Sequence, residues 1–353
     1  MGNELVYSSN LSDFKMKTGY WSLFLIIVSL VFSTGCFKED EKITPHTPGE
    51  GKSITIALEG DYKYRSWVQL ATSSEIYREL KTTYDLEFEN GSTSWRIHPN
   101  TSLFMKVALT TQKNPENITD TIGLKWAFDS SNGFTSGNAF YGWCDTVTGK
   151  GDQLVRVIDR GIDLKGRSRG FYKVIIDSVT LDSYYLRYGL LKGVEMKTLI
   201  INKTDKEESV RLLLDDTNPI ISVSVNQSSY DLQFGQYTTL LYTSEGAPYP
   251  YLVTGVLINQ KEVDVAVDSL LGYNNIDLDA AKTLTYSNRK DIIGYNWKQT
   301  VGDVTTGNVS YIIRQGRTYV LRKKDGLYYK MQFIKFYNDS GEKGYPMFLL
   351  APL

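Results

Sequence analysis

Tyr84-Asp85-Leu86-Glu87-Phe88 is a five-residue stretch that returns later in the chain as Tyr230-Asp231-Leu232-Gln233-Phe234. In both copies the apolar residues stand at alternate positions, which is the pattern of a half-buried β-strand. A second pair of related segments follows in the same order, Gly170-Phe171-Tyr172-Lys173 and Gly326-Leu327-Tyr328-Tyr329-Lys330. Two matches in one order predict a diverged duplication.

The rest of the body continues this alternation and predicts an all-β fold. Runs of β-branched and aromatic residues, such as 53–58, 220–225 and 329–334, are separated by Asn-Gly and Asp-Gly turns. We expect few short helices, with Ser74 to Lys81 and Asp277 to Thr283 as the segments that favour a turn or two. The sequence therefore predicts two related β-rich halves of sandwich type, residues 53–215 and 216–353.

Composition narrows the function classes. Lys+Arg 39 against Asp+Glu 40 leaves a net charge of −1, so the chain has no overall field to attract nucleic acid. The 353 residues include 25 Tyr but only 2 His and 2 Cys, the residue types that most metal sites and much acid–base chemistry use. We expect no nucleic-acid partner, no dedicated metal site and no enzyme activity.

One motif resembles a catalytic signature. Gly166-Arg167-Ser168-Arg169-Gly170 has the spacing of a nucleophile elbow, which requires a helix after the serine and a histidine downstream. A strand-like segment follows instead, and both histidines lie upstream. We therefore interpret the motif as a charged turn and name no catalytic residue.

The amino terminus has the layout of a secretory signal. Met16 is a plausible true start, because Lys17 precedes an apolar run from Leu23 to Phe32, and Phe32-Ser33-Thr34-Gly35-Cys36 resembles a bacterial lipobox. The apolar run is shorter than the roughly 20 residues of a spanning helix. We expect a signal peptide over residues 1–35 and lipidation at Cys36.

A charged tether follows the predicted anchor. Residues 36–52 contain Lys38-Glu39-Asp40-Glu41-Lys42 and then a segment rich in Pro and Gly, which cannot bury an apolar face. The acidic cluster resembles the signal that sends some envelope lipoproteins to the cell surface. We expect an outer-membrane, surface-exposed lipoprotein.

The repeated Tyr-Asp-Leu-x-Phe stretch resembles the Trp-Asp-Leu-x-Phe signature of the HmuY-like lipoproteins, with Tyr in place of Trp. Three further segments are similar to that family, and the last is the most specific: Gly246 to Asn259, Asp291 to Lys298, and Tyr328 to Pro346. The resemblance covers the second half well, and the first half mainly over 84–105 and 170–189.

The resemblance implies haem capture beside a TonB-dependent outer-membrane receptor. The best-known members hold the iron with His or Met side chains, but no His, Met or Cys lies between Thr238 and Gly326 in this chain. Because tyrosine can also bind haem iron, Tyr249 and Tyr251 are ligand candidates on the segment Ser244 to Tyr251, which we interpret as a loop. In the first half the candidates are His98 and Met105, which a surface turn and core packing would also explain.

The leading hypothesis is thus a surface-anchored, ligand-binding lipoprotein that acts beside a TonB-dependent transporter, with haem or another porphyrin as one cargo. The alternative is a non-catalytic structural or adhesive envelope lipoprotein that binds a protein or glycan partner.

Overall fold

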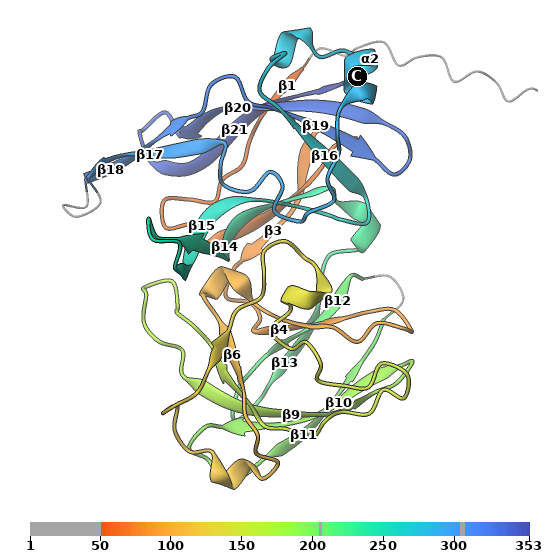
Figure 1. Ribbon diagram of the computed structural model, residues 1–353, viewed down its shortest axis with the longest axis vertical. Coiled ribbons are helices and arrows are strands. Elements are labelled where there is room, and N and C mark those ends of the chain that lie inside the picture. The colour runs from red at the N-terminus through yellow and green to blue at the C-terminus, as the bar shows by residue number, and fades with distance from the viewer. Residues whose placement is uncertain (1–50, 205–206, 304–307) are drawn as a thin grey trace, which may run out of the picture. The chain divides into compact units, whose positions relative to one another are not determined.

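The computed structural model describes residues 51–204, 207–303 and 308–353 (Figure 1). The predicted signal peptide, the predicted lipid anchor Cys36 and the predicted tether up to residue 50 lie outside the described residues. Within the described ranges, no helix has the length and apolar character that crossing a membrane requires.

Antiparallel strands dominate the described chain and confirm the predicted all-β class. The largest sheet has the order β11 (Lys197–Asn202), β10 (Ser183–Leu190), β9 (Phe171–Val179), β8 (Arg156–Asp159), β6 (Lys106–Leu109) and β7 (Trp126–Ala127). A five-stranded sheet has the order β1 (Lys52–Thr55), β21 (Lys343–Pro352), β20 (Tyr328–Tyr337), β19 (Thr318–Lys323) and β16 (Val263–Asp268).

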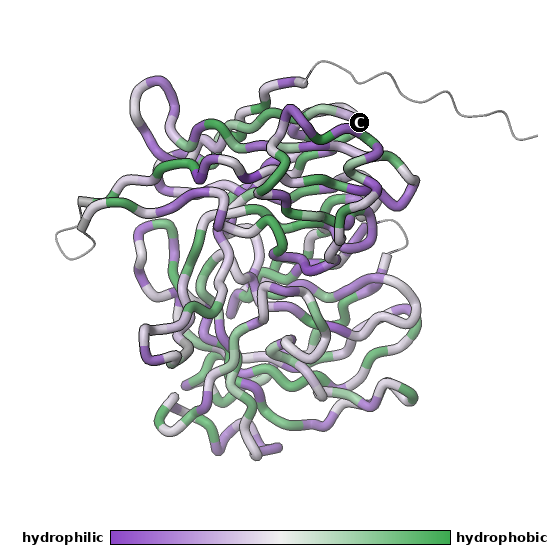
Figure 2. The backbone as a smooth tube through the Cα atoms, turned by 45° about the horizontal axis from the view of Figure 1, so that its top comes forward, coloured by the Kyte–Doolittle hydropathy of each residue, from purple (hydrophilic) through white to green (hydrophobic). Residues whose placement is uncertain are grey.

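Two four-stranded sheets and one hairpin complete the strands of the described residues. One sheet has the order β13 (Ile220–Val223), β12 (Ser209–Leu213), β4 (Leu86–Glu89) and β5 (Ile97–Pro99). The other has the order β15 (Pro248–Ile258), β14 (Leu232–Tyr242), β2 (Tyr64–Gln69) and β3 (Ser74–Leu80). The hairpin pairs β17 (Lys298–Asp303) with β18 (Asn308–Ile313). Hydrophobic and hydrophilic residues alternate along many of these strands (Figure 2).

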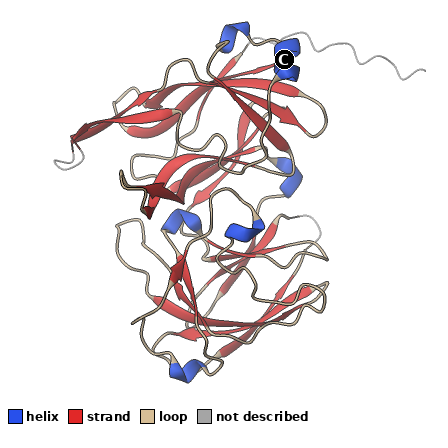
Figure 3. Cartoon of the chain, in the orientation of Figure 1, coloured by secondary structure: helices blue, strands red, loops and turns tan. Residues whose placement is uncertain are grey.

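Helices are few and short in the described part (Figure 3). They are the 3-10 turns η1 (Thr101–Leu103), η2 (Pro115–Asn117), η3 (Thr135–Gly137), η4 (Gln227–Ser229) and η5 (Tyr273–Asn275), and the α-helix α2 (Leu278–Thr283). Asp277 caps α2 by accepting a hydrogen bond from the backbone N–H of Ala280 at 2.8 Å, as expected at a helix start. The expected helical turn at Ser74 is wrong, because these residues pair with β2 as strand β3 and tertiary pairing overrides local preference.

The buried apolar residues form two large clusters. The central core contains buried residues between Leu86 and Leu214, among them Trp143 and Tyr184. The terminal core combines residues between Ile54 and Leu70 with residues between Leu232 and Leu350. Each cluster is large enough to stabilise its own sheets, because a buried aliphatic or aromatic side chain contributes about 1.5–3 kcal/mol.

Strand pairing explains why the terminal core uses both ends of the described chain. Lys52 of β1 stands opposite Leu350 of β21, and Val68 of β2 stands opposite Leu232 of β14. In Figure 1 the orange β1 lies beside the blue β20 and β21. Strands β1, β2 and β3, which the sequence prediction assigns to the first half, therefore belong to sheets of the terminal core. The division into related halves at residue 215 stays a prediction.

The two motif copies lead into β4 and β14 and make matching contacts. The side-chain amide of Asn100 donates to the carbonyl oxygen of Tyr84 at 2.9 Å, and that of Asn259 donates to the carbonyl oxygen of Tyr230 at 3.0 Å. Each asparagine thus connects the start of the motif strand, β4 or β14, to the end of a strand that pairs with it.

Candidate functional site

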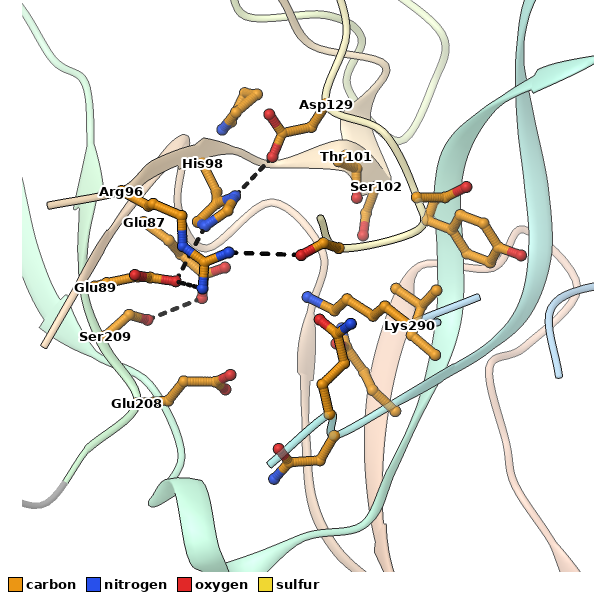
Figure 4. A pocket seen from close by; sticks show the side chains of 18 of the residues that line it. Glu87, Glu89, Arg96, His98, Thr101, Ser102, Asp129, Glu208, Ser209 and Lys290 are labelled. Carbon is orange, nitrogen blue, oxygen red and sulfur yellow. Dashed lines mark hydrogen bonds and ion pairs between the residues drawn. The ribbon is translucent and has the colours of Figure 1, made fainter. Parts of the chain in front are cut away.

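A cavity of about 170 Å³ is lined by β4, β5 and β12 on one side and by residues of the terminal-core segments on the other (Figure 4). Its acidic side chains are Glu87, Glu89, Asp129 and Glu208. Its basic side chains are Arg65, Arg96, His98, Arg211, Lys261 and Lys290. The cavity is therefore polar and carries both signs of charge.

Glu87 and Glu89 lie two positions apart on β4 and share one face of the strand, because side chains alternate along a strand. Arg211 Nε donates to Glu87 Oε1 at 2.6 Å, and Arg96 Nη2 lies 2.6 Å from Glu89 Oε1. Burial acts to raise the pKa of Glu87, but the charges of Arg211 and Arg65 outweigh it and lower the pKa to about 2. Both carboxylates are neutralised within the wall.

His98, the histidine candidate of the sequence, lines this cavity from β5. Its Nδ1 lies 2.7 Å from Asp129 Oδ2 and its Nε2 lies 3.4 Å from Glu89 Oε1. Burial lowers the pKa of His98, but the charges and hydrogen bonds of these carboxylates prevail and raise it to about 9. At neutral pH the ring is an imidazolium that donates from both nitrogens, so in this arrangement it has no lone pair for iron.

Met105, the methionine candidate, precedes β6 and is 1 % exposed within the central core. Its thioether is surrounded by packed side chains and does not line the cavity. This placement agrees with the core-packing alternative that the sequence left open.

Tyr249 and Tyr251 do not line the cavity. They are 39 % and 51 % exposed, and their ring centroids are 6.4 Å apart at a nearly perpendicular angle. They belong to β15 and not to a loop, which corrects the sequence interpretation. Leu241 pairs with Tyr249 and Thr239 pairs with Tyr251. β15 accommodates Pro248 and Pro250 because it is the edge strand of its sheet.

Two further phenols accompany these rings. Burial raises the pKa of Tyr295, and Tyr249 adds to that rise. Burial likewise raises the pKa of Tyr311, and Tyr251 adds to it. Tyr295 packs against the cluster of Tyr237, Val253 and Leu257, and the last two share one face of β15 with Tyr249 and Tyr251. Tyr311 packs against the terminal core. We call Tyr249, Tyr251 and Tyr295 the tyrosine face.

Ser168 is not placed as a nucleophile elbow would place it. Strand β9 begins three residues later at Phe171, where the elbow requires a helix. Ser168 Oγ accepts a hydrogen bond from the backbone N–H of Gly170 at 3.2 Å. This geometry is that of the charged turn expected from the sequence.

Sequence reasoning missed most of the cavity. Glu87 and Glu89 could have been found, since they are the polar positions of the signature strand. No sequence pattern identifies Arg211, Glu208 and Lys290 as cavity residues. They reach the cavity only through pairing between segments that are distant in the chain. Arg211 and Glu87, for example, are 124 residues apart.

Comparison with known proteins gives one family and several similar structures. The family profile described as HmuY protein matches residues 61–349. Apo PinO from Porphyromonas gingivitis shares 8% identity, with a TM-score of 0.28, over 86% of this chain and 98% of that chain. The apo HmuY analogue TFO from Tannerella forsythia shares 10% identity, with a TM-score of 0.23, over 86% of this chain and 95% of that chain. No curated protein matches the sequence.

Proposed function

Because the chain belongs to the HmuY family, whose profile spans residues 61–349, we propose that it is a ligand-binding lipoprotein that captures haem or a related porphyrin. Family membership is the observation that carries this proposal. In it, lipid on Cys36 anchors the protein to the outer membrane at the cell surface, and a TonB-dependent transporter receives the cargo. The lipobox-like residues before Cys36 and the acidic tether support the location.

The tyrosine face is the binding surface in this proposal. Exposed aromatic rings stack on flat apolar ligands, and a phenol oxygen can bind haem iron. The cavity is the less suitable place for a porphyrin, since about 170 Å³ is below the roughly 300 Å³ at which pockets for drug-sized ligands usually begin. His98 is held by two carboxylates and Met105 by the central core, which leaves Tyr249 and Tyr251 as the exposed candidates.

The test is a titration of haemin into residues 47–353, the compact unit that contains all described strands. We expect a saturable Soret shift. Tyr249→Phe and Tyr251→Phe remove the hydroxyl and keep the ring, so loss of the iron-phenolate spectrum in one of them identifies the ligand. Leucine at the same positions removes the stacking surface and should weaken binding.

Matched controls separate this face from other groups. Tyr141→Phe alters a tyrosine that is 60 % exposed and lies far along the chain, and it should leave the titration unchanged. His98→Gln should also leave it unchanged. A featureless titration, or a Soret shift that both phenylalanine variants retain, contradicts the proposal.

One observation favours the alternative, a structural or adhesive lipoprotein that holds a protein partner. Ile220, Ile221 and Val223 of β13 are 52 %, 46 % and 49 % exposed, and β13 is an edge strand. Exposed apolar edges add strands from partner proteins. The test is co-purification with a transporter encoded beside this chain. Co-purification that Ile221→Lys abolishes, and that does not require haemin, would favour this alternative.

A further inference from the structure

We propose that the charged cavity is a second binding site, which takes a small zwitterionic solute of the free amino acid or dipeptide class. Lys290 would bind the carboxylate of the solute and Glu208 its ammonium group. The site is separate from the tyrosine face, so this inference goes beyond porphyrin capture.

The charges of the cavity fall into two groups. Most are neutralised inside the walls, as in the pairs of Glu87 with Arg211 and of Asp129 with His98. Lys290 differs, because its ammonium group has no hydrogen bond or ion pair with any side chain of the described residues. Its charge acts on Glu87 only through space, where it helps to lower the pKa of that carboxyl. Figure 4 shows the Lys290 side chain reaching into the cavity toward the β4 wall.

Glu208 provides the opposite charge. One of its carboxylate oxygens accepts a hydrogen bond from the hydroxyl of Tyr230 at 2.7 Å. The other oxygen accepts none within the described part of the chain. Glu208 also lines the cavity, and in Figure 4 its carboxylate extends into the same space as Lys290. An open cation and an open anion thus face one small volume.

A further polar group remains available for the rest of a solute. Gln233 lines the cavity and makes no side-chain hydrogen bond to another described residue. Arg65 also lines the cavity, but its unpartnered Nε is enclosed by the protein and is not accessible to a solute. Buried polar groups are normally hydrogen-bonded, so open ones at a cavity indicate a ligand or water in contact with them.

Size and charge together select the class of solute. A volume of about 170 Å³ excludes a porphyrin and suits a small metabolite. A simple anion would meet the carboxylates of Glu87, Glu89 and Glu208, and a simple cation would meet Lys290 and Arg96. An uncharged sugar can hydrogen-bond to Lys290 and Glu208, but it brings no opposite charge to either group, and charge-assisted hydrogen bonds are the stronger ones. A zwitterion provides a partner for each.

The test uses residues 47–353 and follows thermal unfolding with the standard L-amino acids and glycylglycine at millimolar concentration, followed by calorimetry on the best one. A ligand that binds only the folded state raises the unfolding temperature. We expect at least one of these probes to bind, and Lys290→Met and Glu208→Gln each to weaken it about tenfold or more, since a charged hydrogen bond contributes roughly 1.5–3 kcal/mol. Lys282→Met, at a lysine that is 54 % exposed on α2, is the matched control and should change nothing.

Derivatives of the probe identify which residue holds which end. The N-acetyl form lacks the ammonium group, so it should bind wild type and Glu208→Gln equally weakly. The amide form lacks the carboxylate, so it should bind wild type and Lys290→Met equally weakly. Absence of binding by every probe overturns the proposal, as does binding that both variants retain. The haemin titration is independent of these results, so failure here leaves porphyrin capture standing.

Discussion

Asp85 and Asp231 make the same backbone contact in different cores. Asp85 Oδ2 accepts a hydrogen bond from the N–H of Leu214 at 2.8 Å, and Asp231 Oδ2 accepts one from the N–H of Leu70 at 2.7 Å. The two aspartates are 0 % and 1 % exposed. Each carboxylate thus joins the signature strand to the end of the strand that pairs with it, β12 in one case and β2 in the other.

The ion pairs of these aspartates lead to a first prediction. Asp85 is paired with Arg160 and Arg169, and Asp231 with Lys323. Asp85→Asn and Asp231→Asn should each lower the free energy of unfolding by about 3–5 kcal/mol, because removing one partner leaves a buried charge uncompensated. Urea unfolding followed by circular dichroism measures this. Asp339→Asn, at a side chain that is 98 % exposed, is the control. A loss as small as that of the control would contradict the structural role of the motif.

The composition of the two cores leads to a second prediction. All buried members of the central core lie between Leu86 and Leu214, so residues 84–225 should fold alone and unfold cooperatively. Residues 230–353 alone should not, since the terminal core also needs Ile54 to Leu70. A rearranged chain in which residues 52–80 are attached after residue 353 through a linker should restore a folded terminal core. Near-ultraviolet circular dichroism checks each fragment. If residues 53–215 fold better than residues 84–225, the assignment of β1 to β3 to the terminal core is wrong.

His98 predicts a loss of stability in mild alkali. Its pKa is raised from 6.5 to about 9 in the folded state, so the folded protein holds this proton more tightly than the unfolded chain. The contribution of the protonated His98 to the free energy of unfolding is complete below pH 6.5 and disappears as the pH rises through about 9. The difference in unfolding free energy between wild type and His98→Gln should therefore shrink over that window. In residues 47–353 His98 is the only histidine, because the other is His46, so its proton resonance can be titrated directly by NMR. A midpoint near 6.5 would refute the predicted ion pairs.

Lys298 predicts the opposite trend. It is 7 % exposed, its ammonium group donates to the carbonyl oxygen of Thr254, and it lies 4.3 Å from the ring centroid of Trp297. No carboxylate of the described residues pairs with it, and burial lowers its pKa from 10.5 to about 7. The folded protein loses the Lys298 proton at a lower pH than the unfolded chain does. Wild type should therefore gain stability as the pH rises from 7 toward 10.5.

Lys298→Met removes the pH dependence of stability that Lys298 causes. Comparing this variant with wild type therefore separates the effect of Lys298 from that of His98. The variant should be more stable than wild type below pH 7, with a gap that narrows as the pH rises. Denaturant midpoints at pH 6 and pH 9 test this, with Lys282→Met as the exposed control. A gap that is the same at both pH values would show that Lys298 is not buried as described.

Local patterns predicted the strands better than they predicted the site. The Tyr-Asp-Leu-x-Phe copies lead into β4 and β14 as alternation requires, and Asp277 does begin a helix. The two prolines that flank Tyr249 favour a loop, and the edge position of β15 explains how a strand accommodates them. Lys290 and Glu208 reach the same cavity through long-range pairing, which no local pattern encodes. The pairing of His98 with two carboxylates is equally invisible in sequence, and it changes what that histidine can bind.

The pairing of β1 with β21 also constrains the order in which the chain can fold during synthesis. The central core can form once residue 225 has been made, whereas β1 and β2 wait for β21 and β14, the partners that cover Ile54 and Val68. Over that interval apolar strands are exposed with unpaired edges, which favours aggregation and slows folding. A premature stop that removes only β21 would leave β1 without its partner, so loss of the last strand should harm the first.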